Sequence, residues 1–200
     1  MGCGVGMIAA NAISVMTLCR TGACSRELTC NPTFTGFLVS ELLPWAQGLY
    51  NFPTDPHQTV VGGSSFGGLA ATCAGLRHSE TFGNVLSQSG SFCWTPPGTN
   101  NSYSETDRKN WIAEQFIMSA KLPVRFHLDA GSDEIDFGDG RSSILVATQN
   151  LRDVLLAKGY DVHFQEFAGG HDDLSWRGTL ADGPILLMGK PSVEPRKSRN

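Results

Sequence analysis

Gly62-Gly63-Ser64-Ser65-Phe66-Gly67-Gly68 is the most informative segment of this sequence. It follows a short apolar run at 59–61 and leads into small residues at 69–74 that favour a helix. A strand, a tight glycine turn and a helix form the setting of a nucleophile elbow, in which G-x-S-x-G exposes a serine at the apex. Glycine suits so sharp a turn because a Cβ there would collide with the neighbouring strand or helix. The alternative is a glycine-rich turn without chemistry, and a motif this short occurs by chance, so the rest of the chain must decide.

The composition favours a single globular domain. Two hundred residues are enough to bury a core, and 40% hydrophobic residues with 11 Phe and 4 Trp exclude a disordered chain. We predict one domain at 1–189 and a polar tail at 190–200. The 19 acidic and 15 basic residues give a net charge of −4, and no long basic run occurs. These charges predict neither a nucleic-acid partner nor a membrane partner.

The cysteines and the apolar N-terminal run argue against a metal site and a membrane segment. Six cysteines are present, but the spacing of Cys19, Cys24 and Cys30 lacks the paired C-x2-C pattern of zinc sites. We therefore predict no metal and no cofactor. Cys73 is interpreted as a small buried hydrophobe. The apolar run at 5–18 is too short to span a bilayer and has no basic residue before it, which favours a core strand over a signal peptide.

Hydrophobic periodicity predicts strands that alternate with helices. Ser142 or Ser143 can cap a predicted helix at 142–158, and Gly159 can end it. Gly183-Pro184 should interrupt the last predicted helix, at 173–188. This alternation predicts an α/β fold with a mostly parallel sheet and helices on both faces. The predicted strands are 10–19, 58–62, 83–90, 123–130 and 161–167, and the predicted helices are 34–47, 66–77, 106–119, 142–158 and 173–188.

Three polar features follow predicted strands, and the carboxyl ends of parallel strands meet at one edge of a sheet. They are Ser65, an acidic loop at 131–140, and His171. The order serine, acid, histidine is that of the α/β-hydrolases. We predict Ser65 as the nucleophile and His171 as its general base, the alternative for His171 being an ordinary solvated loop histidine.

The remaining members of the predicted site are less specific. Glu134 is the preferred acid, with Asp133 and Asp136 left open as alternatives. The backbone N–H of Phe66, at the start of the helix, should donate to the oxyanion. A second donor ordinarily comes from a loop after an earlier strand, and with only about one strand before the elbow it is not located.

Several phrases of the sequence resemble the enterochelin (enterobactin) esterases, a group in the esterase D-like branch of the α/β-hydrolases. They occur in the family's order and cover about residues 25–189. The phrases are Ser25-Arg26-Glu27-Leu28-Thr29-Cys30-Asn31-Pro32-x-Phe34, Glu41-Leu42-Leu43-Pro44-Trp45, Gly63-Ser64-Ser65-Phe66-Gly67-Gly68-Leu69-Ala70, Phe82-Gly83-x-Val85-Leu86-Ser87-Gln88-Ser89-Gly90-Ser91-Phe92-x-Trp94 and Gly169-Gly170-His171-Asp172-x3-Trp176-Arg177.

The resemblance implies a cytoplasmic serine esterase that opens the trilactone of a ferric catecholate siderophore. It places the nucleophile at Ser65, the base at His171 and an acid at Glu134, although some members work as a Ser–His dyad. Substrate-binding positions near the site fall on Arg26, Trp94, Trp176 and Arg177. Arginine charge and tryptophan faces suit an anionic aromatic substrate, while core packing is the alternative for the two tryptophans.

The chain departs from the family pattern before the Arg26 phrase. Members carry an N-terminal substrate-binding domain or several more strands there, and the resemblance places the second oxyanion donor in that part. We therefore expect an N-terminally shortened hydrolase, or a fragment that completes its sheet as a homo-oligomer. The alternative functions are a general carboxylesterase acting on simple esters or thioesters, and a catalytically silent fragment.

Overall fold

The computed structural model describes residues 3–9, 14–19, 24–50, 54–97, 110–135 and 143–189. The predicted tail at 190–200 and the candidate acid Asp136 lie outside these residues. The strands are β1 (Cys3–Ala9), β2 (Ser14–Cys19), β3 (Thr59–Ser64), β4 (Asn84–Gln88), β5 (Arg125–Gly131) and β6 (Asp161–Phe167). The helices are α1 (Cys24–Glu27), α2 (Pro32–Phe37), the π-helical turn η1 (Leu38–Leu42), α3 (Leu43–Leu49), the 3-10 turn η2 (Pro56–Gln58), α4 (Phe66–Arg77), α5 (Trp111–Met118), α6 (Ile144–Ala157), α7 (Asp173–Thr179) and α8 (Asp182–Met188).

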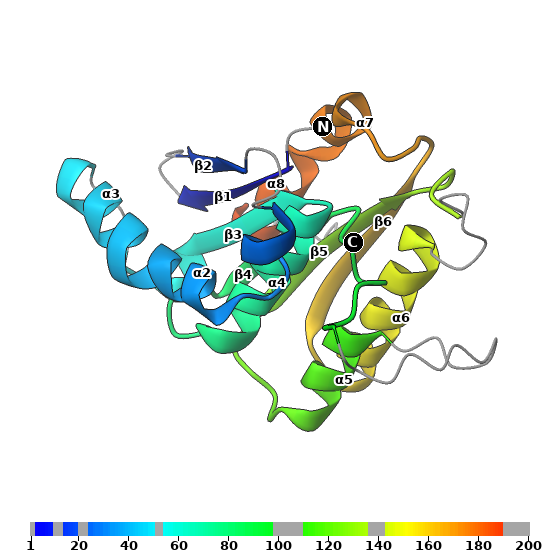
Figure 1. The fold of residues 1–200 in the computed structure, drawn as a ribbon, viewed down its shortest axis with the longest axis horizontal. Coiled ribbons are helices and arrows are strands. Elements are labelled where there is room, and N and C mark those ends of the chain that lie inside the picture. Colours follow the sequence, from blue (N-terminus) through cyan, green and yellow to red (C-terminus); the bar gives the residue numbers. More distant parts are fainter. Residues whose placement is uncertain are drawn as a thin grey trace, which may run out of the picture.

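All six described strands form one sheet in the order β2-β1-β3-β4-β5-β6 (Figure 1). The four strands from β3 to β6 run parallel, whereas β1 is antiparallel to both β2 and β3. This arrangement confirms the predicted α/β class. Two strands precede the elbow, so the prediction of about one was wrong. The elbow strand β3 therefore lies inside the sheet, hydrogen-bonded on both sides.

Helices cover both faces of the sheet, as predicted (Figure 1). Val61 and Val85 point into the main core beneath α4, α5 and α6. Their neighbours Val60 and Leu86 point the other way and pack against Leu187 of α8. This alternation is the period of a strand that is buried on both faces. No helix in the described ranges is long and apolar enough to cross a membrane.

Strong local signals placed several element boundaries correctly. The predicted bounds of α4 and β6 agree with the structure. Ser143 caps α6 by accepting a hydrogen bond from the Val146 N–H at 3.1 Å. Gly159, beyond the end of α6, has φ of 77°, a conformation that glycine adopts without strain.

Proline bears on two of the places where the predicted helices differ from the structure. The predicted helix at 34–47 is a longer helical segment with a π-turn in which the Leu43 N–H bonds to the Leu38 carbonyl. Pro44 follows directly, and a proline lacks the N–H and crowds the carbonyl four residues earlier, which a widened turn relieves. The last helix breaks at residues 180–181 rather than at Gly183-Pro184, because Pro184 lies in the first turn of α8, where a proline is tolerated.

Cys73 is buried, as predicted, but it does not act only as a small hydrophobic side chain. It forms a disulfide with Cys30. Cys73 lies in α4, the helix that follows the elbow, and both cysteines are buried. The bond spans 43 residues of sequence, with the two Cα atoms 5.5 Å apart. It ties the segment after α1 to the helix that carries the candidate nucleophile at its start.

Breaking this disulfide should lower the free energy of unfolding by about 4 kcal/mol, the loop-entropy value for a closed loop of this length. Urea unfolding of the wild type with and without dithiothreitol measures the effect. A Cys30→Ala/Cys73→Ala protein, which lacks this bond, is the matched control and should not show this loss when the reductant is added. An equal response in both proteins would contradict the expectation.

Candidate active site

Ser65 connects the end of β3 to the start of α4 in a strained conformation, with φ of 57° and ψ of −124°. A non-glycine residue in such a region costs about 1–3 kcal/mol and persists only where its surroundings hold it. Two backbone hydrogen bonds keep Ser65 in this conformation. The Ser65 N–H donates to the Gln88 carbonyl at 2.9 Å, and the Ser65 carbonyl accepts from the Ser91 N–H at 3.0 Å. The elbow is thus clamped to the end of the neighbouring strand.

Close packing behind the elbow requires a glycine at position 68. A Cβ on Gly68 would lie 2.3 Å from the Ser87 Oγ and 3.0 Å from the Gly90 Cα. The absence of a side chain lets the first turn of α4 lie directly against the end of β4.

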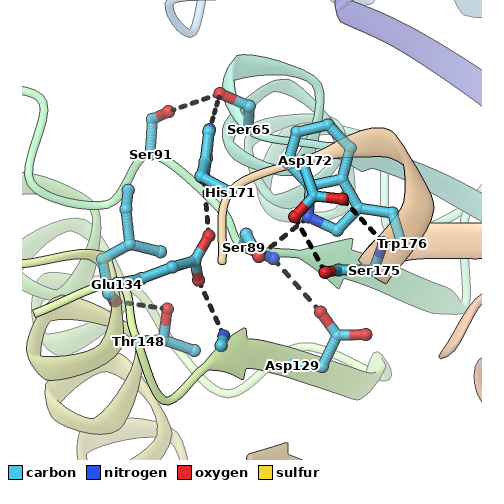
Figure 2. Close-up of polar contacts among 12 residues, drawn as sticks. Ser65, Ser89, Ser91, Asp129, Glu134, Thr148, His171, Asp172, Ser175 and Trp176 are labelled. Carbon is cyan, nitrogen blue, oxygen red and sulfur yellow. Dashed lines mark hydrogen bonds and ion pairs between the residues drawn. The ribbon is translucent and has the colours of Figure 1, made fainter. Parts of the chain in front are cut away.

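The structure brings Ser65, His171 and Glu134 into one hydrogen-bonded line (Figure 2). The His171 Nε2 lies 2.9 Å from the Ser65 Oγ, and the His171 Nδ1 lies 2.6 Å from Glu134 Oε1. Ser65 follows β3, Glu134 follows β5 and His171 follows β6, so three strands of the parallel part of the sheet deliver the three side chains to one edge. This is the geometry in which a histidine can take a proton from a serine.

Glu134 is well placed to orient a histidine. Its side chain is 1% exposed, and its second oxygen, Oε2, accepts the Gly131 N–H at 2.7 Å. Its carbonyl accepts the Ser143 hydroxyl at 3.1 Å, which ties the loop to the start of α6. Asp133 is exposed, and its carboxylate accepts from the adjacent Ser132 hydroxyl at 3.3 Å. Of the two described candidates for the acid, only Glu134 lies within hydrogen-bonding distance of the imidazole.

The surroundings of Ser65 include one hydroxyl that the sequence did not single out. Ser91 Oγ lies 3.3 Å from Ser65 Oγ (Figure 2). Phe66 is the first residue of α4, and its N–H belongs to the helix-terminal donors that have no intrahelical acceptor. This position agrees with the predicted oxyanion donor, and the second donor stays unassigned.

The four predicted substrate-binding residues lie in different settings. Arg26 in α1 and Arg177 in α7 are exposed. Trp94 is half-buried and packs edge-to-face against Trp111, with ring centroids 5.6 Å apart. Trp176 is 7% exposed, lies edge-to-face against the His171 ring, and donates its indole N–H to the Ser89 hydroxyl at 2.9 Å. Their roles toward a substrate stay predictions.

A second buried carboxylate, Asp129 in β5, lies near the site and was missed by the sequence analysis. Asp129 Oδ1 accepts the Ser89 N–H at 3.2 Å, while Oδ2 has no hydrogen-bond partner among the described residues. Burial raises its pKa to about 6, although the nearby Thr179 and Gln88 side chains and the Ser89 N–H favour the charged form. Its position inside a strand, as one polar residue in an alternating pattern, gave no signal of this environment.

Asp129→Asn should remove a pH-dependent penalty on folding. Its folded pKa of about 6 exceeds its ordinary value of 3.8, so the folded state binds the proton more tightly than the unfolded state. The wild-type free energy of unfolding should therefore fall by about 3 kcal/mol as the pH rises from about 4 to about 6. The stability of the Asn variant relative to wild type should rise by the same amount over that range. Urea unfolding at pH 4 and pH 7 tests this, and a difference between the two proteins that does not change with pH would contradict it.

Comparison with known proteins gives one consistent result. The Esterase family model, described as "Putative esterase", matches residues 5–187. The iron(III) enterobactin esterase of Dickeya dadantii (strain 3937) is 38% identical over 170 residues, which cover 82% of this chain and 37% of that protein. The iron(III) salmochelin esterase of Escherichia coli O6:H1 is 38% identical over 137 residues, 68% of this chain and 32% of that protein.

Solved structures agree with these relatives. The crystal structure of the enterobactin esterase from Shigella flexneri in the presence of 2,3-dihydroxy-N-benzoylglycine superposes with a TM-score of 0.73 at 34% identity. The match covers 88% of this chain and 44% of that one. The chain thus spans less than half the length of each of these three relatives.

Proposed function

This chain belongs to the Esterase family, and from that premise we propose that it hydrolyses carboxylic esters through an acyl-enzyme at Ser65. The observation that carries the proposal is the hydrogen-bonded line from Glu134 through His171 to Ser65. A serine hydroxyl is a weak nucleophile until a base accepts its proton, and the base needs a partner that fixes its tautomer. His171 lies within hydrogen-bonding distance of both Ser65 and Glu134.

The first half of the reaction forms the acyl-enzyme. Ser65 Oγ attacks the ester carbonyl carbon while its proton passes to His171 Nε2, and Glu134 stabilises the imidazolium that results. The carbonyl oxygen becomes an oxyanion that accepts the Phe66 N–H. When the intermediate collapses, the C–O bond to the alcohol breaks and His171 returns the proton to the leaving oxygen.

The second half regenerates the enzyme. A water molecule attacks the acyl carbon while His171 accepts one of its protons. The bond to Ser65 Oγ then breaks, the acid leaves, and the proton returns to Ser65. The strained elbow suits this cycle because it presents the hydroxyl above the sheet edge, where both a substrate and a water molecule can reach it.

We propose a trilactone siderophore of the ferric enterobactin kind as the substrate class. Support comes from the names of the relatives, which are iron(III) enterobactin and salmochelin esterases. The exposed Arg26 and Arg177 offer positive charge for an anionic ferric catecholate. Iron is part of this substrate, and the groups of the protein that act on the ester are Ser65, His171, Glu134 and the Phe66 N–H.

Two further predictions about the protein's context accompany the proposal. The predicted cytoplasmic location stays a prediction, and the Cys30–Cys73 disulfide weighs against it, because disulfides are rare in cytosolic proteins. A homo-oligomer would place a second copy against an edge strand of the sheet, β2 or β6.

A fluorophosphonate probe and a competition assay test the proposal. Labelling should occur at Ser65, and ferric enterobactin should be hydrolysed and should inhibit turnover of a short aryl ester. Labelling with aryl ester turnover but no action on ferric enterobactin would favour a general carboxylesterase on simple esters or thioesters. No labelling of the folded protein would favour a catalytically silent hydrolase fold and overturn the proposal.

A further inference from the structure

We propose that Trp176 is a positioning residue that holds the His171 imidazole in line between Ser65 and Glu134, and that Ser89 in turn fixes Trp176. The inference rests on the esterase function proposed above and extends it to a residue that does not touch the reacting atoms. It replaces the expectation that Trp176 binds substrate with a role in orienting the base.

His171 lies on the loop between β6 and α7, and contacts with other segments hold its imidazole. His171 follows Gly169 and Gly170, and the Gly169 carbonyl accepts the Asp133 N–H at 3.1 Å. The hydrogen bonds at Nδ1 and Nε2 hold the two nitrogens of the ring. A contact on the ring from another direction further restricts movement of the imidazole.

Trp176 supplies such a contact. Its ring and the His171 ring lie edge-to-face, with centroids 4.9 Å apart and an interplanar angle of 86°. This is a preferred geometry for two aromatic rings. Trp176 lies five residues after His171, on the α7 helix that begins just beyond it, so the contact closes a short loop of chain on itself.

Trp176 is itself held, at its carbonyl and at its indole N–H, by two consecutive residues at the end of β4, Gln88 and Ser89. The side-chain amide of Gln88 donates to the Trp176 carbonyl at 2.8 Å, and it also donates to the Thr179 hydroxyl at 2.7 Å. The Ser89 hydroxyl accepts the indole N–H at 2.9 Å (Figure 2). A buried indole held by its backbone and by its N–H has little freedom to move away from the histidine.

Hydrogen bonds to Asp129 hold the backbone of Ser89 in place. Its φ is 46°, a left-handed conformation that is uncommon for serine. Its N–H donates both to the Asp129 carbonyl at 2.9 Å and to the Asp129 carboxylate at 3.2 Å. Since Gln88 also accepts the Ser65 N–H, the same strand end supports the nucleophile and, through Trp176, the base. A single rigid segment thus fixes the distance between the two groups that exchange a proton.

The exposed fraction of Trp176 argues against the substrate-binding alternative. At 7% exposed, the indole offers a substrate little surface, whereas a side chain that stacks on a catecholate needs an open face. Its buried position and its two hydrogen bonds are those of a supporting residue.

Trp176→Leu should lower kcat for a short aryl ester by about 30- to 100-fold, because a small misplacement of a catalytic group costs about that much. KM should stay within about threefold, since the ester does not contact the indole. The rate constant for labelling of Ser65 by a small alkyl fluorophosphonate should fall by the same factor as kcat. Trp176→Phe, which keeps a ring but lacks the N–H, should recover part of the loss.

A double-mutant cycle tests the link to Ser89. Ser89→Ala alone should lower kcat and the labelling rate, but in the Trp176→Phe background it should have no further effect, because the phenylalanine has no N–H to donate. Phe116→Leu is the matched control for loss of a buried aromatic side chain. Phe116 is fully buried in α5 against Phe126 and Tyr160, and its loss should lower the melting temperature while leaving kcat unchanged.

The outcomes separate the inference from the proposed function. A raised KM for Trp176→Leu with an unchanged labelling rate would show that the indole binds substrate, and unchanged kcat, KM and labelling would show that it only packs. Either result overturns the positioning role while leaving the esterase proposal intact. Failure of the wild-type protein to label at Ser65 would instead overturn the proposed function.

Discussion

Ser65→Ala should lower the rate of ester hydrolysis by about 10⁴- to 10⁶-fold, the loss seen when a serine nucleophile is removed from a triad. The change deletes one oxygen, and without it no acyl-enzyme can form, while the fold and the His171–Glu134 pair are kept. Hydrolysis of a short aryl ester and labelling by a fluorophosphonate measure the loss. The variant should keep a melting temperature near the wild-type value, because the backbone hydrogen bonds that hold the elbow are kept.

Ser64→Ala is the matched control for this experiment, because it makes the same small change at the neighbouring position, at the end of β3. It should keep most of the wild-type activity. Equal activity in Ser65→Ala and wild-type protein would place the chemistry elsewhere and contradict the proposed mechanism.

Glu134→Gln should lower kcat by about 10³- to 10⁴-fold, through the tautomer of His171 rather than through charge alone. The glutamine oxygen can still accept the Gly131 N–H that Glu134 Oε2 accepts at 2.7 Å, so the loop should keep its shape. Its NH2 group then faces His171 Nδ1 and must donate to it. A proton on Nε2 is the consequence, and an Nε2 that carries a proton cannot take one from Ser65.

Asp133→Asn makes the same chemical change one residue earlier, on an exposed side chain, and should leave kcat near the wild-type value. If Glu134→Gln were also near wild type, His171 would act with Ser65 as a dyad and the acid would be dispensable. A large loss in Asp133→Asn with none in Glu134→Gln would exchange the roles of the two acids. Steady-state kinetics on the purified variants, with thermal melting to confirm folding, distinguishes these results.

Local sequence signals predicted the features that depend on neighbouring residues. The bounds of α4 follow from the glycine turn before it, and the bounds of β6 follow from the alternation within it. The approximate position of the candidate site also followed, because strand ends of a parallel sheet share one edge. The structure brings Ser65, Glu134 and His171 to that edge.

Features that depend on contacts between distant segments could not be predicted. The Cys30–Cys73 bond joins residues 43 positions apart, and nothing in the cysteine spacing indicated the pairing. The hydrogen bond from Trp176 to Ser89 spans 87 positions and could not be read from either phrase alone. The environment of Asp129 arises only when α7 packs over the ends of β4 and β5. A residue's type and spacing suggest what it can do, whereas its neighbours in space decide its pKa and its orientation.

The strained backbone of Ser65 bears on how such a chain evolves. Glycine would adopt the φ of 57° at position 65 without the energetic cost that serine bears there. A mutation that relieves the backbone strain at this position is therefore expected to increase the stability of the protein while it abolishes ester hydrolysis. Selection for folding alone would favour glycine at position 65. Selection for a reactive hydroxyl would retain serine there.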